Sequence, residues 1–304
     1  MKKLTERQQL RILNERNMEV YKRNDMIQKA RFSLSVVEQR AVLYAISKIQ
    51  PEDTYLKEYT FNLKEFYRVI GWEKESYSDF KNMLKKLRDK SWWITLPDGK
   101  TESAVSWFST VRSNESKGKV TVKFHEDMMP YLIELAEQNV FYTSFNLAYV
   151  LPMSSQYAPR LYEILKSYSN NEDWFFEIDE IKYLLDCENY KNYNDFQRRA
   201  LEPAVADINK YSDICVHYEE QREGRGGKVV RIYFYLSKKT KSEIALAEDK
   251  VKEALDGPVD LQTFREDYAN SEKAKFREER EKAKEQERAS QERLSHYGPR
   301  KNRS

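Results

Sequence analysis

Cysteine, proline and glycine are scarce in this sequence of 304 residues, which contains two, eight and eight of them respectively. Cys187 and Cys215 are too few and too far apart for a disulfide framework or a Cys-x-x-Cys metal site, so we expect a reduced, cytoplasmic protein. Apolar runs are also short, and none approaches the roughly 18 residues of a membrane span. The charged start, MKKLTERQQLRILNERN, lacks the apolar segment of a secretory signal. We therefore expect no membrane association.

No charge of one sign dominates, because 53 basic side chains face 50 acidic ones and leave a net charge of +3. Such a total says little about nucleic-acid binding, and the distribution of charge matters more. Residues 1–31 hold nine basic and four acidic groups, residues 32–240 hold 29 and 31, and residues 241–304 hold 15 of each. Together with 21 Tyr and 14 Phe, this distribution indicates a nearly neutral folded centre that contains sheets, with charged segments on both sides.

The centre contains an internal repeat. Residues 59–70 match residues 174–185 at an offset of 115, and Glu65 coincides with Glu180. Three further matches keep the same order along the chain: 40–46 with 160–165, 77–80 with 193–196, and 87–94 with 208–215. One such match could arise by chance, but four in order indicate a duplication.

Each copy shows the same series of predicted elements. Ser35 and Glu38 form a capping box at the start of a helix, and Gly71 is placed to end another. In the first copy we expect helices at 35–46, 63–70 and 77–90, strands at 59–62, 92–96, 105–111 and 119–124, and a turn at 97–99. In the second copy we expect helices at 156–168, 178–185 and 194–211 and strands at 174–177, 214–220 and 229–236.

This order of helices followed by a β-hairpin is that of a winged helix, whose second and third helices form a helix-turn-helix. We therefore predict an α+β fold with two tandem winged-helix domains related by internal duplication. The predicted parts are a basic N-terminal arm (1–30), domain 1 (31–138, with a linking amphipathic helix at 127–137), domain 2 (139–240) and a charged tail, helical or disordered (241–304).

Three segments carry a resemblance to a known family: RFSLSVVEQR at 31–40, APRLYEILK at 158–166 and LEPAVADIN at 201–209. They resemble the replication initiator (Rep) proteins of theta-replicating, iteron-type plasmids, over residues 24–240. The resemblance implies a DNA-binding initiator that binds direct repeats of the origin, helps to open an AT-rich segment and recruits the host initiator and replicative helicase. It also implies a homodimer, built on domain 1, that represses its own promoter at an operator inverted repeat.

The helix at 194–211 is the predicted reader of the major groove. Its apolar stripe consists of Phe196, Ala200, Leu201, Val205 and Ile208, which leaves the candidate DNA-binding residues Asn194, Gln197, Arg198, Arg199 and Lys210 outside. Arginine can bind guanine through two hydrogen bonds, and asparagine or glutamine can do the same with adenine. Pro203 lacks a backbone donor and should kink or reset the helix. The alternative is an ordinary solvated helix face.

Two further basic segments are candidate DNA contacts. Arg225 and Lys228 lie in the glycine-rich tip of the second hairpin, where a wing can reach phosphate or the minor groove, although a solvated turn is the alternative. The helix at 77–90 presents Lys81, Lys85, Lys86 and Arg88, which suit phosphate attraction, although they could simply keep the helix soluble. Strand alternation should bury one residue of each aromatic pair, Trp92-Trp93 and Trp107-Phe108.

Enzymatic signatures are weak. The histidines at 125, 217 and 296 do not cluster, so the metal site of a nicking initiator is not expected. The Gly-Lys dipeptides at 99, 118 and 227 complete no phosphate-binding P-loop. We therefore expect no catalysis, cofactor or metal. A winged-helix transcriptional regulator without initiator activity remains the alternative, because its DNA-reading parts would be identical, and a nicking rolling-circle initiator is less favoured.

Overall fold

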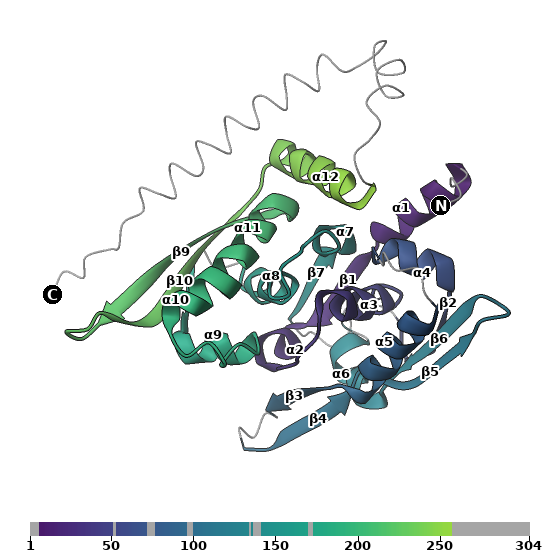
Figure 1. The fold of residues 1–304 in the computed structure, drawn as a ribbon, viewed down its shortest axis with the longest axis horizontal. Helices are drawn as coiled ribbons and strands as arrows, with labels where there is room; N and C mark the ends of the chain where they lie inside the picture. Colours follow the sequence, from purple (N-terminus) through teal and green to yellow (C-terminus); the bar gives the residue numbers. More distant parts are fainter. Residues whose placement is uncertain are drawn as a thin grey trace, which may run out of the picture.

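The computed structural model describes residues 6–50, 53–71, 77–95, 100–133, 135, 141–169 and 173–256. Two three-stranded sheets, each with its own helices, lie at opposite ends of the molecule (Figure 1). The first unit contains α3 (Val36–Ile46), β2 (Glu58–Asn62), α4 (Leu63–Val69), α5 (Tyr77–Asp89), β5 (Phe108–Asn114) and β6 (Lys119–Phe124). The second contains α8 (Ala158–Ser167), β8 (Asp173–Glu177), α9 (Ile178–Leu184), a third helix over 193–211, β9 (Ile214–Glu223) and β10 (Lys228–Lys238).

The two sheets have the same topology. Their strand orders are β2-β6-β5 and β8-β10-β9, and all pairs are antiparallel. The pairing Asn62↔Lys119 in the first sheet corresponds to Glu177↔Arg231 in the second, which keeps the offset of 115 between β2 and β8. The predicted duplication of a winged helix is confirmed by this common order.

Local signals in the sequence place the helix ends where they were expected. The Ser35 hydroxyl accepts a hydrogen bond from the Glu38 backbone N–H, and the Glu38 carboxylate accepts one from the Ser35 N–H, so the capping box begins α3. Gly71 follows α4 with a φ of +68°, in the left-handed region that favours glycine after a helix. A Cβ at Gly71 would lie 3.3 Å from the guanidinium of Arg40, so the close approach also favours glycine.

The prediction of one strand over 105–111 is wrong. The chain forms β4 (Glu102–Ser106) and then β5, and β4 pairs with β3 (Ser91–Thr95) in a separate hairpin. The match of 87–94 with 208–215 is therefore misleading, because β5 and not β3 takes the place that β9 occupies in its sheet. In the second domain β9 follows the third helix within three residues, so the β3–β4 hairpin is an insertion in the first.

The insertion also explains where the tryptophans lie. Trp92 is buried and Trp93 is 46% exposed, as alternation along β3 predicts. Trp107 and Phe108 are both buried, contrary to the prediction, because the chain passes from one sheet to the other between β4 and β5. The Trp107 ring packs edge-on against Phe32, with ring centroids 5.1 Å apart.

The linking helix expected at 127–137 is shorter than predicted. It comprises a 3-10 turn, η1 (Glu126–Met128), and α6 (Met129–Leu132). Ile133 is extended and buried, so this apolar residue reaches the core without a further helical turn. Residues 134 and 136–140 lie outside the described part of the chain, as does the turn predicted at 97–99.

Most of the predicted N-terminal arm is part of the folded body. Residues 6–29 form α1 (Glu6–Arg16), β1 (Glu19–Arg23) and α2 (Asn24–Lys29). Strand β1 pairs along its length with β7 (Tyr142–Asn146) in the middle of the molecule (Figure 1). The basic composition of this segment is misleading because a few apolar residues, including Ile12, Val20 and Met26, are buried and hold it in place.

The start of the charged tail is also folded. Residues 241–256 form α12 (Lys241–Asp256), which packs against the third helix of domain 2 and against α7 (Leu147–Val150). Leu246, Ala247 and Val251 are buried at this contact. Residues 257–304 lie outside the described part of the chain. The tail was predicted to be helical or disordered, and its first 16 residues form a helix that packs against the folded body.

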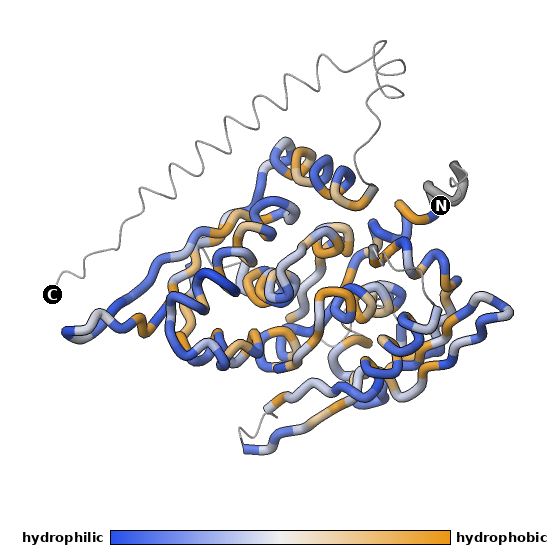
Figure 2. The backbone as a smooth tube through the Cα atoms, in the orientation of Figure 1, coloured by the Kyte–Doolittle hydropathy of each residue, from blue (hydrophilic) through white to orange (hydrophobic). Residues whose placement is uncertain are grey.

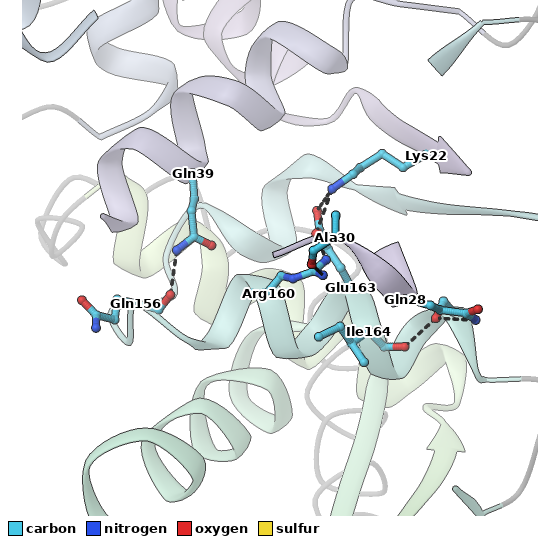
Figure 3. Close-up of polar contacts among 9 residues, drawn as sticks. Lys22, Gln28, Ala30, Gln39, Gln156, Arg160, Glu163 and Ile164 are labelled. Atoms are coloured by element: carbon cyan, nitrogen blue, oxygen red, sulfur yellow. Dashed lines mark hydrogen bonds and ion pairs between the residues drawn. The ribbon is translucent and has the colours of Figure 1, made fainter. Parts of the chain in front are cut away.

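A buried ionic cluster joins β1 to α8 between the two domains (Figure 3). The Lys22 ammonium donates to both carboxylate oxygens of Glu163, at 3.0 and 2.9 Å, and these side chains are only 2% and 3% exposed. The Arg160 guanidinium lies 3.6 Å from the same carboxylate and donates to the carbonyl oxygen of Ala30. Burial lowers the pKa of Lys22, a shift that Glu163 opposes, and burial also lowers the pKa of Arg160 to about 10.

Hydrogen bonds extend this junction on either side of the cluster. The Gln39 amide of α3 donates to the carbonyl oxygen of Gln156 at 2.7 Å (Figure 3). Arg40 donates to the carbonyl oxygens of Ile70 and Met153, which belong to different domains. Arg31, just after α2, forms ion pairs with Asp186 and Glu188 beyond α9. The junction is thus polar, with a buried centre at Lys22, Arg160 and Glu163 and a partly exposed edge at Arg31.

Replacing Glu163 with glutamine should destabilise the protein by about 3–5 kcal/mol, because two buried cations lose the carboxylate that they share. Lys22→Met should cost less, since Arg160 still faces Glu163 in that variant. Urea unfolding followed by circular dichroism measures both. An equal loss of unfolding free energy in the two variants would contradict this prediction, because Glu163 faces two cations whereas Lys22 faces one carboxylate.

Candidate nucleic-acid interface

The third helix of domain 2 contains a widened turn. It consists of α10 (Tyr193–Phe196), a π-helical turn, η2 (Gln197–Leu201), and α11 (Glu202–Tyr211). Pro203 lies in the first turn of α11, and it has no N–H to donate to the carbonyl oxygen of Arg199 four residues earlier. A π-helical turn adjusts the helix at this point, so the predicted reset at Pro203 is confirmed.

The helix presents two exposed arginines on this turn. Its predicted apolar stripe is buried, and the Arg198 and Arg199 side chains are 69% and 59% exposed. Asn194 is exposed on the preceding turn. Asp195 forms ion pairs with both arginines, at 3.4 and 3.6 Å. The structure therefore brings together three of the five residues predicted on this helix and adds a carboxylate that competes for the two cations.

The other two predicted residues have different surroundings. The Gln197 amide donates to the Tyr218 hydroxyl of β9 at 3.1 Å, so its side chain links the helix to the hairpin. Lys210 lies near the far end of α11, with its ammonium 4.8 Å from the Tyr211 ring centroid. A hydrogen bond with Tyr211 raises the pKa of Lys210, and Glu253 of α12 adds to the shift. Lys210 is thus separated from the two arginines by the length of α11.

The wing of domain 2 is anchored near the start of this helix. A turn is closed by the hydrogen bond from the Gly227 N–H to the Gly224 carbonyl oxygen, and both glycines have positive φ. Arg225 and Lys228 are exposed at this hydrophilic tip (Figure 2). At its base, the Arg222 guanidinium lies 5.9 Å from the centroid of the Tyr193 ring, at the first residue of α10. The wing and the first turn of the helix therefore meet at one end of the domain.

In domain 1 the basic residues of α5 lie outside, as predicted. Its buried face consists of Phe80, Met83, Leu84 and Leu87. Its exposed residues include all the basic candidates, which are Lys81, Lys85, Lys86 and Arg88. Arg88 forms an ion pair with its neighbour Asp89, which reduces the local positive charge.

The wing tip of domain 1 was not among the DNA contacts predicted from the sequence. Its turn is closed by the hydrogen bond from the Gly118 N–H to the Glu115 carbonyl oxygen, and Lys117 and Lys119 are exposed beside it. Gly118 has a φ of +57°, and its counterpart Gly227 has a φ of +59°. A signal was present, because both wings contain a Gly-Lys dipeptide at this position, although such a dipeptide also suggests a nucleotide-binding loop.

The described residues contain no group of three or more His, Cys, Asp or Glu side chains that could hold a metal. His125 accepts a hydrogen bond from the Asp127 N–H at the start of η1, and the His217 ring stacks on Tyr235. Cys187 and Cys215 form no disulfide within the described part of the chain. Within the same part of the chain, no helix has the length and apolar character needed to cross a bilayer.

These features define a protein with two winged-helix domains, each with exposed basic side chains on its third helix and at its wing. Residues 19–166 match the family described as initiator replication protein, WH1, and residues 177–236 match initiator Rep protein, WH2. The chain therefore belongs to the family of replication initiator proteins. The first match includes β1, β7 and α8, so it runs across the polar junction and takes in the first helix of the second winged helix.

Two individual proteins are similar to this chain. The PI protein of Escherichia coli is 26% identical over 208 residues, a match that spans 63% of this chain and 66% of the relative. The structure titled "Crystal structure of Pi initiator protein in complex with iteron DNA" matches with a TM-score of 0.60 and 18% identity. That match covers 74% of this chain and 99% of the solved chain. At this identity the second likeness concerns the fold.

Replacing Asp195 with asparagine should strengthen binding to random duplex DNA about two- to fivefold at low salt. The change frees Arg198 and Arg199 and removes a negative charge beside them, and exposed ion pairs of this kind are worth up to about 1 kcal/mol. Fluorescence anisotropy over a range of salt concentrations measures the effect. An unchanged or weaker affinity would show that this turn does not face DNA, and Asp207→Asn, at an acidic residue nearer the other end of the helix, is the matched control.

Proposed function

We propose that this protein initiates the replication of an iteron-type plasmid by binding direct repeats of the origin through both winged helices. The observation that carries the proposal is the repetition of one basic arrangement in each domain, an exposed third helix beside a basic wing. Membership of the initiator family and the likeness to a protein crystallised with iteron DNA support it.

The two domains differ in the contacts that they can make. Domain 2 offers Asn194, Arg198 and Arg199 on two successive turns of its third helix, and these side chains match the hydrogen-bonding edges of adenine and guanine. Domain 1 offers lysines on α5 and at its wing, and lysine suits phosphate as a compact charge. We infer that domain 2 supplies most of the sequence discrimination and that domain 1 supplies mainly electrostatic affinity.

Regulation and recruitment follow the family's pattern in this proposal. A homodimer through domain 1 would have the two-fold symmetry of an operator inverted repeat and so would allow repression of the protein's own promoter. Chains bound at the origin would open the AT-rich segment and recruit the host initiator and replicative helicase. The protein acts in the cytoplasm and needs no catalytic step of its own.

A transcriptional regulator with the same surfaces is the second candidate. Footprinting separates the two functions, because protection of tandem direct repeats beside an AT-rich tract supports an initiator and protection of a single promoter palindrome supports a regulator. A nicking initiator is tested by incubating supercoiled origin DNA with Mg²⁺ or Mn²⁺. A site-specific nick with protein covalently attached would overturn the proposal.

Arg198→Ala and Arg199→Ala should each weaken binding to the origin repeat by ~1–3 kcal/mol if they contact bases. Binding to random DNA should change much less, and competition titrations measure both affinities. Lys241→Ala is the control, because it removes one exposed positive charge at a residue that is not among the predicted DNA contacts. Equal losses on both DNAs would assign the two arginines to phosphate contacts.

Lys85→Ala combined with Lys86→Ala should lower the slope of log K against log salt by about 0.9 for each phosphate that the protein no longer neutralises. The reduction should be similar on origin and random DNA, since phosphate contacts do not read sequence. Lys238→Ala with Lys241→Ala, exposed lysines at the end of β10 and the start of α12, is the control for total charge. An unchanged slope would remove α5 from the interface.

A further inference from the structure

The sheet of domain 2 has an open face lined with aromatic rings. Along β10, Ile232 and Phe234 are buried, so Tyr233 and Tyr235 lie on the opposite face. Tyr233 pairs with Phe175 of β8, whose side chain is 46% exposed, and Tyr235 pairs with His217 of β9. The ring centroids are 5.5 Å apart in the first pair and 6.1 Å apart in the second.

These rings are held in place at the surface. The Tyr233 hydroxyl donates to the Gln221 side chain at 3.1 Å, and the Tyr235 hydroxyl donates to the Glu219 carboxylate at 3.3 Å. Both acceptors lie on β9, so each tyrosine lies across the sheet rather than pointing away from it. A preorganised aromatic surface loses little side-chain entropy when a partner binds.

Domain 1 provides an internal comparison for this face. Its sheet has the same strand order, and Thr60 and Thr121 occupy the places of Phe175 and Tyr233. Those threonine hydroxyls hydrogen-bond to each other at 2.8 Å, and the position of Tyr235 is taken by Lys123. The winged-helix fold is therefore compatible with a polar outer face. The aromatic residues of domain 2 call for another explanation, and exposed apolar clusters are typical of binding surfaces.

The charges around the rings indicate what kind of partner fits. Asp173, Glu177 and Glu219 lie on the same face, where Arg231 is the basic residue of β10. These carboxylates would repel a phosphate backbone and attract cations. Arg231 already makes a cation–π contact on this face, because its guanidinium lies 5.2 Å from the Phe175 ring centroid. The same guanidinium donates a hydrogen bond to the Glu177 carboxylate at 2.5 Å. Cation–π contacts of this kind favour arginine.

We propose that the outer face of the β8-β10-β9 sheet docks an arginine- and lysine-rich segment of a partner protein. The segment's cations would lie over Phe175 and the two tyrosines and pair with the bordering carboxylates. The helices of the domain cover the other face of the sheet, where Ile232 and Phe234 are buried. Because the exposed arginines of the third helix lie on that helical side, the partner and DNA can be bound at the same time.

Three labelled probes of equal length test the proposal on the full chain by fluorescence anisotropy: a peptide of alternating arginine and leucine, a peptide of alternating glutamate and leucine, and a thymidine oligonucleotide. We expect saturable binding of the arginine peptide alone. Phe175→Thr with Tyr233→Thr, which gives this face the residues of domain 1, should weaken that binding about tenfold. Thr60→Ala with Thr121→Ala should leave it unchanged.

Retained affinity for duplex DNA and an unchanged thermal transition show that the variants are folded. Binding of the arginine peptide that is the same in the Phe175→Thr, Tyr233→Thr variant would overturn the proposal. Preference for the oligonucleotide, abolished in this variant, would assign the face to single-stranded nucleic acid instead. Self-association of the chain, abolished in the same variant, would assign it to a second copy.

Discussion

The contact between Lys22 and Glu163 holds together parts of the chain that are 141 residues apart. Lys22 belongs to β1, which pairs with β7, and Glu163 belongs to α8, the first helix of domain 2. A charge removed from water is costly unless it is paired, so neither residue can leave the junction without the other being destabilised. The relative position of the two winged helices therefore depends on the Lys22–Glu163 ion pair, which is favourable only when the two charges stay in contact.

The buried junction fixes how the two duplicated winged helices lie relative to each other. Two winged helices on a flexible linker would bind DNA as independent modules, whereas two that share a buried junction present their third helices at a defined spacing. Arg31 strengthens the arrangement, because its ion pairs with Asp186 and Glu188 connect the end of α2 to the loop that follows α9. Its backbone also pairs with Trp93 of the inserted hairpin. The insertion in domain 1 is thereby fixed to the same junction.

The features that could be predicted from the sequence depend on local rules. The capping box at Ser35, the glycine after α4 and the apolar stripe of the third helix need only neighbouring residues, and all three are confirmed. Pairing between strands that are far apart in the chain could not be predicted from local patterns. The separation of β4 from β5 and the pairing of β1 with β7 were therefore missed. The same limit applies to Gln197, whose partner Tyr218 lies on another element.

Hydroxyl-radical footprinting on tandem repeats tests the central claim, that two domains joined by a buried junction bind one repeat together. The account predicts two protected segments in every repeat at a constant spacing, one weakened by Arg198→Ala with Arg199→Ala and the other by Lys85→Ala with Lys86→Ala. A single protected segment in each repeat, or two whose spacing varies from repeat to repeat, would contradict it.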